Sequence, residues 1–139
     1  MRHSAWTYLT ASAILISFDQ GLKYYLQEST RAFMNEKGSF LFPVSPGLII
    51  IASIVIISVL SHLLFKKTTP RSMTLGLTFI ISGGVGNLID RIIYGYVQDI
   101  IAIASARFNL ADMYIVMGAV FLLWGVYQDE LRSKLSEIE

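Results

Sequence analysis

The chain has 139 residues, of which 54% are hydrophobic, and its mean hydropathy is +0.58. This composition is too apolar for an ordinary soluble domain of that size, so we expect one domain, residues 1–139, embedded in a membrane. The formal net charge is +1 and the charges are scattered, which excludes a basic surface for nucleic acid. Cysteine is absent, which excludes disulfides and thiol catalysis.

The first apolar stretch spans about residues 5–23 and contains small residues at 11–13 that are typical of a signal-peptide cleavage site. The apolar run continues past them to Phe18, whereas a cleavage site should end it, so we expect a retained transmembrane helix. Asp19 and Lys23 are four residues apart, acid first, which favours an ion pair one helical turn apart. We interpret this pair as structural support near lipid.

Three further apolar segments, at about 48–65, 73–91 and 110–127, each approach the ~20 residues that a helix needs to cross a bilayer. Between the first two spans, residues 24–46 have mixed polarity, and residues 38–45 are rich in aromatic side chains, which favours a strand or two on the membrane surface. The sequence therefore predicts an all-α membrane protein with four transmembrane helices and a small extramembrane segment containing β-structure on the outer side.

An even number of spans places both ends of the chain on one side of the membrane. The densest basic loop, with Lys66, Lys67 and Arg71, lies on that same side, so the positive-inside rule predicts cytoplasmic termini. Trp6 and Trp124 then mark the inner membrane interface. The residues expected at the outer interface are Tyr24, Tyr25, Tyr94 and Tyr96.

Polar residues gather where the third span ends. Asn87, Asp90 and Arg91 have helical i, i+3, i+4 spacing and would share one face. Asp99 and Asp112 flank a short segment, so a turn would bring their carboxylates together. On the expected topology eight polar residues lie at the outer boundary, which is typical of a functional site: Asp19, Lys23, Asn87, Asp90, Arg91, Asp99, Asn109 and Asp112.

Two neighbouring carboxylates can share one proton, so that one acts as a base and the other as an acid. The base would activate a water to attack a carbonyl, and Arg91 or an Asn amide would stabilise charge that develops on oxygen. The histidines, His3 and His62, lie far from the carboxylates, so we expect neither a metal nor another cofactor. A serine protease is disfavoured because no histidine lies on the catalytic side.

Three blocks of the chain, FDQGLKYYL, GGVGNLIDRIIYGYVQDII and FNLADMY, resemble the lipoprotein signal peptidases, also called signal peptidase II, in the order found in that family. The resemblance implies that Asp99 and Asp112 form a catalytic dyad. It also implies that Asn87, Arg91 and Asn109 position the substrate.

The same resemblance assigns structural support to Asp19 and Lys23, and we expect the same of Asp90. The family's outer loop carries an N-x-G-x-A-F segment, whereas this chain reads MNEKGSFLF, with one residue more between Asn35 and Gly38. Asn35 is therefore a weaker counterpart of that substrate-binding Asn.

The resemblance implies an aspartic endopeptidase of the bacterial inner membrane, with its active site toward the outer, periplasmic face. It would remove the signal peptide from a prolipoprotein, cutting just before a cysteine that carries diacylglyceryl. The implied partners are this lipidated prolipoprotein and membrane lipids, and we expect a monomer.

Two alternatives from other classes stay open. A small ion or proton transporter also places charges within helices, although here they gather at one boundary. A non-catalytic membrane assembly protein would use its small residues for helix packing, for example Ser82 with Gly86, and Gly76, Gly83 and Gly84.

Overall fold

The computed structural model describes residues 5–29, 33–35, 45–66, 69–103 and 106–136, which form long helices joined by short strands. The elements in chain order are α1 (Ala5–Ser29), β1 (Phe33–Asn35), α2 (Pro46–Phe65), α3 (Arg71–Tyr94), β2 (Val97–Asp99), β3 (Ile101–Ile103), β4 (Ala106–Phe108) and α4 (Leu110–Ser136).

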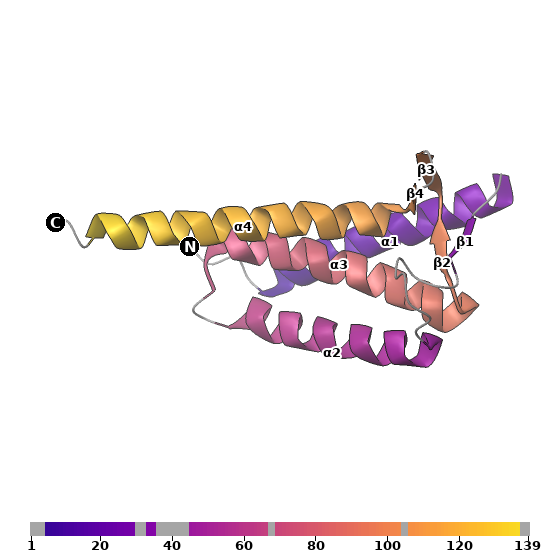
Figure 1. Ribbon diagram of the computed structural model, residues 1–139, viewed down its shortest axis with the longest axis horizontal. Coiled ribbons are helices and arrows are strands. Elements are labelled where there is room, and N and C mark those ends of the chain that lie inside the picture. The colour runs from indigo at the N-terminus through magenta and orange to yellow at the C-terminus, as the bar shows by residue number, and fades with distance from the viewer. Residues whose placement is uncertain (1–4, 30–32, 36–44, 67–68, 104–105, 137–139) are drawn as a thin grey trace.

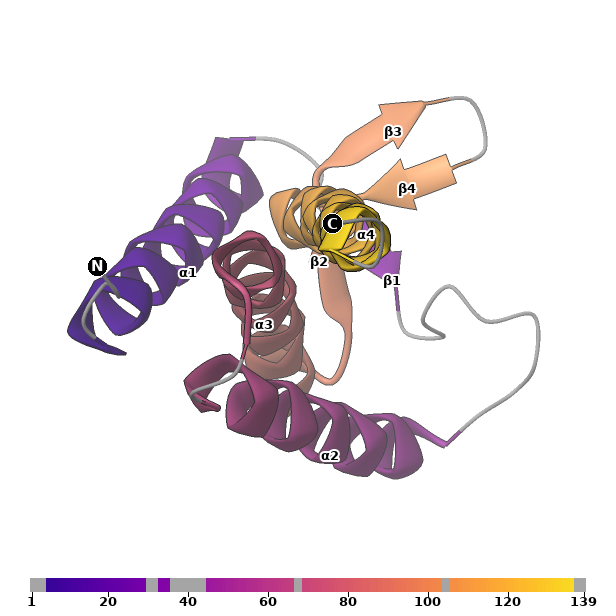
Figure 2. The same ribbon diagram turned by 90° about the vertical axis from the view of Figure 1, so that its left-hand side faces the viewer.

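The four helices lie along the long axis of the molecule, and α3 lies among the other three (Figures 1 and 2). Each of α1, α2 and α4 contacts α3, and the contact between α3 and α4 is the most extensive. All the strands lie at one end, whereas α1 begins and α4 ends toward the opposite end (Figure 1). The helices therefore alternate in direction, and the loops between them divide into two sets.

Within the described residues, three helical segments are long and apolar enough to cross a membrane, namely Pro46–Phe65, Met73–Tyr94 and Leu110–Ser136. They contain the predicted second, third and fourth spans. The predicted first span lies in α1, which is not among the three, and its crossing of the membrane stays a prediction. Helix α4 also continues nine residues past the predicted end at residue 127, because its polar last turns remain helical.

The outward surfaces of these helices are apolar. On α2, Ile51 and Ile56 are more than half exposed and only Leu64 is buried. Leu64 packs with Leu77 and Ile81 of α3 in a small apolar cluster. A helix that is apolar all round, with so little protein cover, is suited to lipid rather than water.

Helices α3 and α4 approach so closely that their backbones touch. A Cβ added to Gly76 would lie 2.7 Å from the carbonyl oxygen of Gly118, and a Cβ on Gly118 would lie 2.6 Å from that of Gly76. This contact confirms that Gly76 serves helix packing, as the sequence predicts, and adds Gly118, which the sequence analysis missed.

The strands pair in two antiparallel ribbons. β1 pairs with β2, placing Phe33 opposite Asp99, and β3 pairs with β4, placing Ile101 opposite Phe108. The small β-containing segment is thus present. Of the stretch in which the sequence predicts strands, residues 38–44 lie outside the described residues, while Ser45 caps α2 by accepting a hydrogen bond from the Leu48 N–H at 3.3 Å.

Gly95 ends α3 and redirects the chain toward the site. It has φ 81°, the left-handed conformation typical of a residue that follows a helix, and its N–H donates to the Arg91 carbonyl at 3.1 Å. The chain then returns along β2, which carries Asp99 back against the bundle.

Candidate active site

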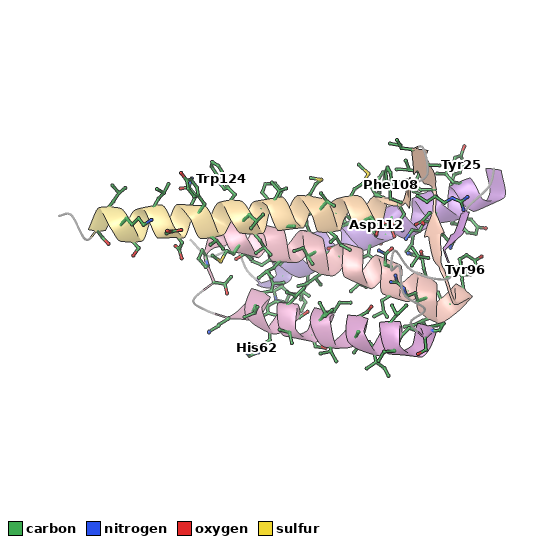
Figure 3. All side chains as sticks on the ribbon, viewed as in Figure 1. Tyr25, His62, Tyr96, Phe108, Asp112 and Trp124 are labelled. Carbon is green, nitrogen blue, oxygen red and sulfur yellow. The ribbon has the colours of Figure 1, made fainter. Side chains whose placement is uncertain are left out.

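The most deeply buried large side chains of the described residues are polar, which is the reverse of a soluble protein. Asp112 and Phe108 lie near the strand end of the bundle, whereas Trp124 is further along α4 toward the other end (Figure 3). The fully buried set comprises Lys23, Gln98, Asn109, Asp19, Asp90, Asp99 and Ser82. Polar groups withdrawn from both lipid and water require partners within the protein.

Helix α4 begins with a reciprocal cap formed by two of the predicted site residues. The Asp112 N–H donates to Asn109 Oδ1 at 2.9 Å, and the Asn109 N–H donates to Asp112 Oδ2 at 3.2 Å. This is a capping box, in which side chains three residues apart satisfy each other's amides. The three-residue spacing in NLAD therefore fixes the Asp112 carboxylate at a helix start, where the helix dipole favours negative charge.

Asn87 contacts the same carboxylate from α3. Its Nδ2 donates to Asp112 Oδ1 at 2.8 Å, and its Oδ1 accepts a hydrogen bond from Asn109 Nδ2 at 3.0 Å. Both oxygens of Asp112 are thus hydrogen-bonded. The two asparagines hold one another as well as the aspartate.

Asp99, the last residue of β2, is joined to this group through Asn109. Asn109 Nδ2 donates to Asp99 Oδ1 at 3.2 Å in addition to its bond with Asn87. Asn109 is fully buried and Asp99 is 1% exposed. One amide side chain therefore bridges the two aspartates that the sequence analysis selected as a dyad.

Arg91 lies in the last turn of α3 and is half-buried. Its Nη1 donates to the Asn87 carbonyl oxygen at 3.3 Å. Its positive charge is near enough to interact with Asp112, Asp90 and Asp99. It therefore contributes positive charge beside both of the bridged aspartates.

A second buried cluster, which we call the lysine network, consists of Asp19, Gln20, Lys23 and Asp90. Lys23 Nζ lies 2.7 Å from Asp19 Oδ2 and 2.9 Å from Asp90 Oδ2. Gln20 Nε2 donates to Asp19 Oδ2 at 3.1 Å and to Asp90 Oδ1 at 3.0 Å. The pair of Asp19 with Lys23 is therefore part of a larger group that ties α1 to α3.

The sequence predicts that Gly86 pairs with Ser82 in helix packing. A Cβ on Gly86 would lie 2.8 Å from Asp19 Oδ2 and 3.3 Å from the Ala111 side chain, so this glycine makes room mainly for a carboxylate. The Ser82 hydroxyl instead donates within its own helix, to the Thr78 carbonyl at 2.7 Å.

An apolar groove of about 400 Å³ begins beside Asp112 and follows α4. Its lining is almost entirely apolar, with Asp112 contributing the carboxylate at one end. The lining residues are Phe108, Asp112, Met113, Val116 and Met117. An extended hydrocarbon chain could lie along such a groove with its polar end at the carboxylate.

Asn35 is placed only in part. Its backbone belongs to β1 opposite Val97, two positions along the ribbon from the pairing of Phe33 with Asp99. The position of its side chain lies outside what the structure describes. The strand nevertheless places the backbone of Asn35 beside the strand that carries Asp99.

The sequence analysis missed Gln20 and the backbone amides of Gln98 and Ala111, which bond to the lysine network. The Gln98 N–H donates to Asp90 Oδ2 at 3.1 Å, and the Ala111 N–H donates to Asp19 Oδ1 at 3.0 Å. Gln20 stands between Asp19 and Lys23 in the FDQGLK block, and this position beside two charged residues could have indicated that it belongs to the site. The backbone contacts leave no trace in side-chain chemistry.

The fold and this site define a membrane protein of several helices in which buried asparagines join two carboxylates at one end of the bundle. The family model for signal peptidase II matches residues 11–128. The chain therefore belongs to the signal peptidase II family, and is a peptidase and a multi-pass protein of the bacterial inner membrane.

Relatives with assigned names agree with this placement. The chain is 34% identical over 112 residues to a lipoprotein signal peptidase of Clostridium tetani, covering 76% of this chain and 69% of that protein. It is 37% identical over 81 residues to one of Clostridium novyi, covering 54% and 55%. It is 26% identical over 159 aligned positions to one of Brucella ovis, covering 97% and 98%.

Two solved structures, each described as a bacterial membrane enzyme, share the fold. One superposes with a TM-score of 0.82 at 19% identity, covering 93% of this chain and 92% of the other. The second gives 0.79 at 20% identity, covering 92% and 97%. These similarities concern the fold alone.

Proposed function

We propose that the protein is an aspartic endopeptidase that removes the signal peptide from diacylglyceryl-modified prolipoproteins, cutting just before the lipidated cysteine. The observation that carries this proposal is the bridge from Asp99 through Asn109 to Asp112, because one residue donates hydrogen bonds to both carboxylates. The names of the relatives support the substrate class.

The mechanism needs one proton shared between the aspartates. The ionised carboxylate takes a proton from water, and the resulting hydroxide adds to the carbon of the scissile carbonyl, while the protonated carboxyl gives its proton to the carbonyl oxygen. When the tetrahedral intermediate collapses, the C–N bond breaks and the proton held by the first carboxyl passes to the leaving amine. The second carboxylate takes a proton from a hydroxyl of the intermediate as the carbonyl re-forms, which restores the starting protonation of the pair. Asp99 and Asp112 perform these two roles between them.

The asparagines orient the acid and base. Asn87 and the Asn109 backbone each donate to one oxygen of Asp112, which leaves the carboxylate little freedom to rotate. Arg91, whose charge interacts with both Asp112 and Asp99, would stabilise negative charge that develops on the carbonyl oxygen of a substrate bound at the aspartates. Fixed hydrogen bonds of this kind require no reorganisation during the reaction.

The apolar groove beside Asp112 suits a substrate whose cysteine carries diacylglyceryl. Phe108 and Met113 line the groove together with Asp112, and Val116 and Met117 line it about one helical turn further along α4. The lipid would then lie along α4 while the peptide bond lies at the aspartates. Gathering of the polar groups at one end of the bundle favours this function over a transport pathway through the bilayer.

We further propose that α1 is a fourth span and that the aspartates face the periplasm. Asp19 and Lys23 do not prevent α1 from crossing, because their charges are directed into the lysine network, at 1% exposure each. The basic residues near the α2–α3 connection support a cytoplasmic location for that end of the bundle, by the positive-inside rule.

The direct test is incubation of the purified protein in lipid vesicles with a synthetic prolipoprotein peptide, with and without diacylglyceryl on its cysteine. Mass spectrometry should detect a new amino terminus at the modified cysteine and no product from the unmodified peptide. Cleavage at another position, or equal cleavage of both peptides, would contradict the proposal.

A further inference from the structure

Lys23 connects two carboxylates that otherwise would face each other without a counter-charge between them. Its Nζ is 2.7 Å from Asp19 and 2.9 Å from Asp90, and all three side chains are at most 1% exposed. Charge-assisted bonds this short, shielded from water, restrict the positions of both carboxylates. The ammonium group therefore fixes one carboxylate relative to the other.

Each of these carboxylates accepts a hydrogen bond from the backbone amide of the residue that precedes one of the two proposed catalytic aspartates. Asp90 Oδ2 accepts the N–H of Gln98, the residue immediately before Asp99. Because Gln98 and Asp99 are consecutive in β2, a displacement of this amide also displaces the Asp99 carboxylate.

The other contact follows the same pattern. Asp19 Oδ1 accepts the N–H of Ala111, the residue immediately before Asp112. This amide belongs to the first turn of α4, whose N–H groups have no partner within the helix and need one outside it. Asp19 thereby fixes the position of α4 from the opposite side of the capping box.

We infer that Lys23 is a positioning residue that sets the separation of Asp99 and Asp112. Its ammonium group joins the two carboxylates that hold the backbone amide preceding each aspartate, so the lysine network acts as a clamp on the dyad. The inference rests on the proposed function of that dyad. It goes beyond support of the fold, because it predicts that each correctly folded molecule of a Lys23 variant cleaves its substrate more slowly than the wild type.

The decisive variant is Lys23→Met/Asp90→Asn. It removes one positive and one negative charge. The formal net charge of the lysine network therefore stays at −1, which Asp19 alone now carries. Asn at position 90 keeps the shape of the side chain, and the variant should therefore fold. Without the ammonium group, the distance between the Gln98 and Ala111 amides is no longer fixed, so Asp99 and Asp112 can move relative to each other. A displacement of reacting groups by about 1 Å can cost about 10²-fold in rate.

We expect kcat per folded molecule of this variant to fall about 10²-fold with little change in KM. Tm should fall as well, because Asp19 is left buried without its counter-charge. Lys134→Met is the matched control, because Lys134 and Glu130 form an i, i+4 pair of the same 2.7 Å length that is exposed on α4. It should change neither kcat nor Tm. A double variant with wild-type kcat would overturn the inference.

Amide hydrogen exchange, followed by NMR in detergent micelles, tests the clamp without any substrate. The Gln98 and Ala111 amides should exchange at least about tenfold faster in the double variant, the scale set by loss of a hydrogen bond to a charged group. The Gly118 amide, at the α3–α4 crossing, should not change. Unchanged exchange at both Gln98 and Ala111 would contradict the clamp even if the wild type cleaves prolipoprotein.

The two proposals can thus fail separately, since a wild type that does not cleave the peptide contradicts only the function. If the double variant does not accumulate, Asp19→Asn provides the same test with an isosteric change. It should speed exchange at Ala111 more than at Gln98 and lower kcat with little effect on KM. Wild-type kcat in that variant would also overturn the inference.

Discussion

Asn109 and Asp112 cap each other at the start of α4, the asparagine through its side-chain oxygen and the aspartate through its carboxylate. The same asparagine donates to Asp99, so one side chain both starts the helix and joins the two aspartates. Helix capping and the geometry of the proposed dyad are therefore inseparable at this position. This overlap explains why asparagine, with both an acceptor and a donor, is suited to it.

Substitutions at Asn109 should separate these two roles. Asn109→Ser retains a side-chain oxygen for the cap but lacks the amide that bridges Asn87 and Asp99, so we expect a smaller loss of stability than in Asn109→Ala and a large loss of kcat. Asn109→Ala loses both and should also lower stability by about 0.5–2 kcal/mol, the usual cost of a lost helix cap. Thermal unfolding and peptide cleavage measure the two effects, and full activity in Asn109→Ser would contradict the bridging role.

The glycine contact between α3 and α4 should be intolerant of one added methyl group. Gly118→Ala would place its Cβ against the Gly76 carbonyl. A backbone group cannot avoid the contact by changing rotamer as a side chain can, so the two helices must move apart. We expect a loss of stability of about 1–3 kcal/mol, the range for overpacking in a filled interior. Gly21→Ala is the control, because no atom of the described residues, apart from those of its chain neighbours and its own helix backbone, lies within 4 Å of its added Cβ. It should be neutral or stabilise α1 by roughly 0.5–1 kcal/mol.

Chemical labelling can test the proposed orientation, since the protein has no cysteine of its own. Ser133→Cys lies near the end of α4, and Ala102→Cys lies in β3 at the strand end of the bundle; both positions are exposed. An impermeant thiol reagent added to intact spheroplasts should label position 102 and not position 133. Labelling after lysis provides the control for reactivity, and labelling of both in intact cells would contradict the topology.

The sequence predicts the helices well because the apolar segments are long and uninterrupted, as in α2. It places the ends less well, since the polar last turns of α4 continue the helix without needing lipid around them. The β3–β4 ribbon was not predicted, because short strands such as Ile101–Ile103 are specified by pairing with a partner and carry little signal of their own.

The site shows the same division. Helical spacing brings Asn87 and Arg91 together, and the chemistry of carboxylates singles out Asp99 and Asp112. By contrast, the bond from Lys23 to Asp90 joins residues 67 positions apart, which local spacing cannot reveal. Gln98 was overlooked because its contribution comes from a backbone amide, which every residue but proline possesses.

The final prediction concerns the two aspartates. Asn keeps the shape of Asp but cannot take up or release the catalytic proton, so Asp99→Asn and Asp112→Asn should each lower kcat by at least about 10²- to 10⁴-fold. Because the carboxylates act as one unit, the double variant should be about as inactive as either single variant. Asp112→Asn also changes the hydrogen bond from Asn87, so binding of an uncleavable lipidated peptide must be measured beside cleavage. Each variant should still bind that peptide, and full cleavage activity in either single variant would contradict the aspartic mechanism.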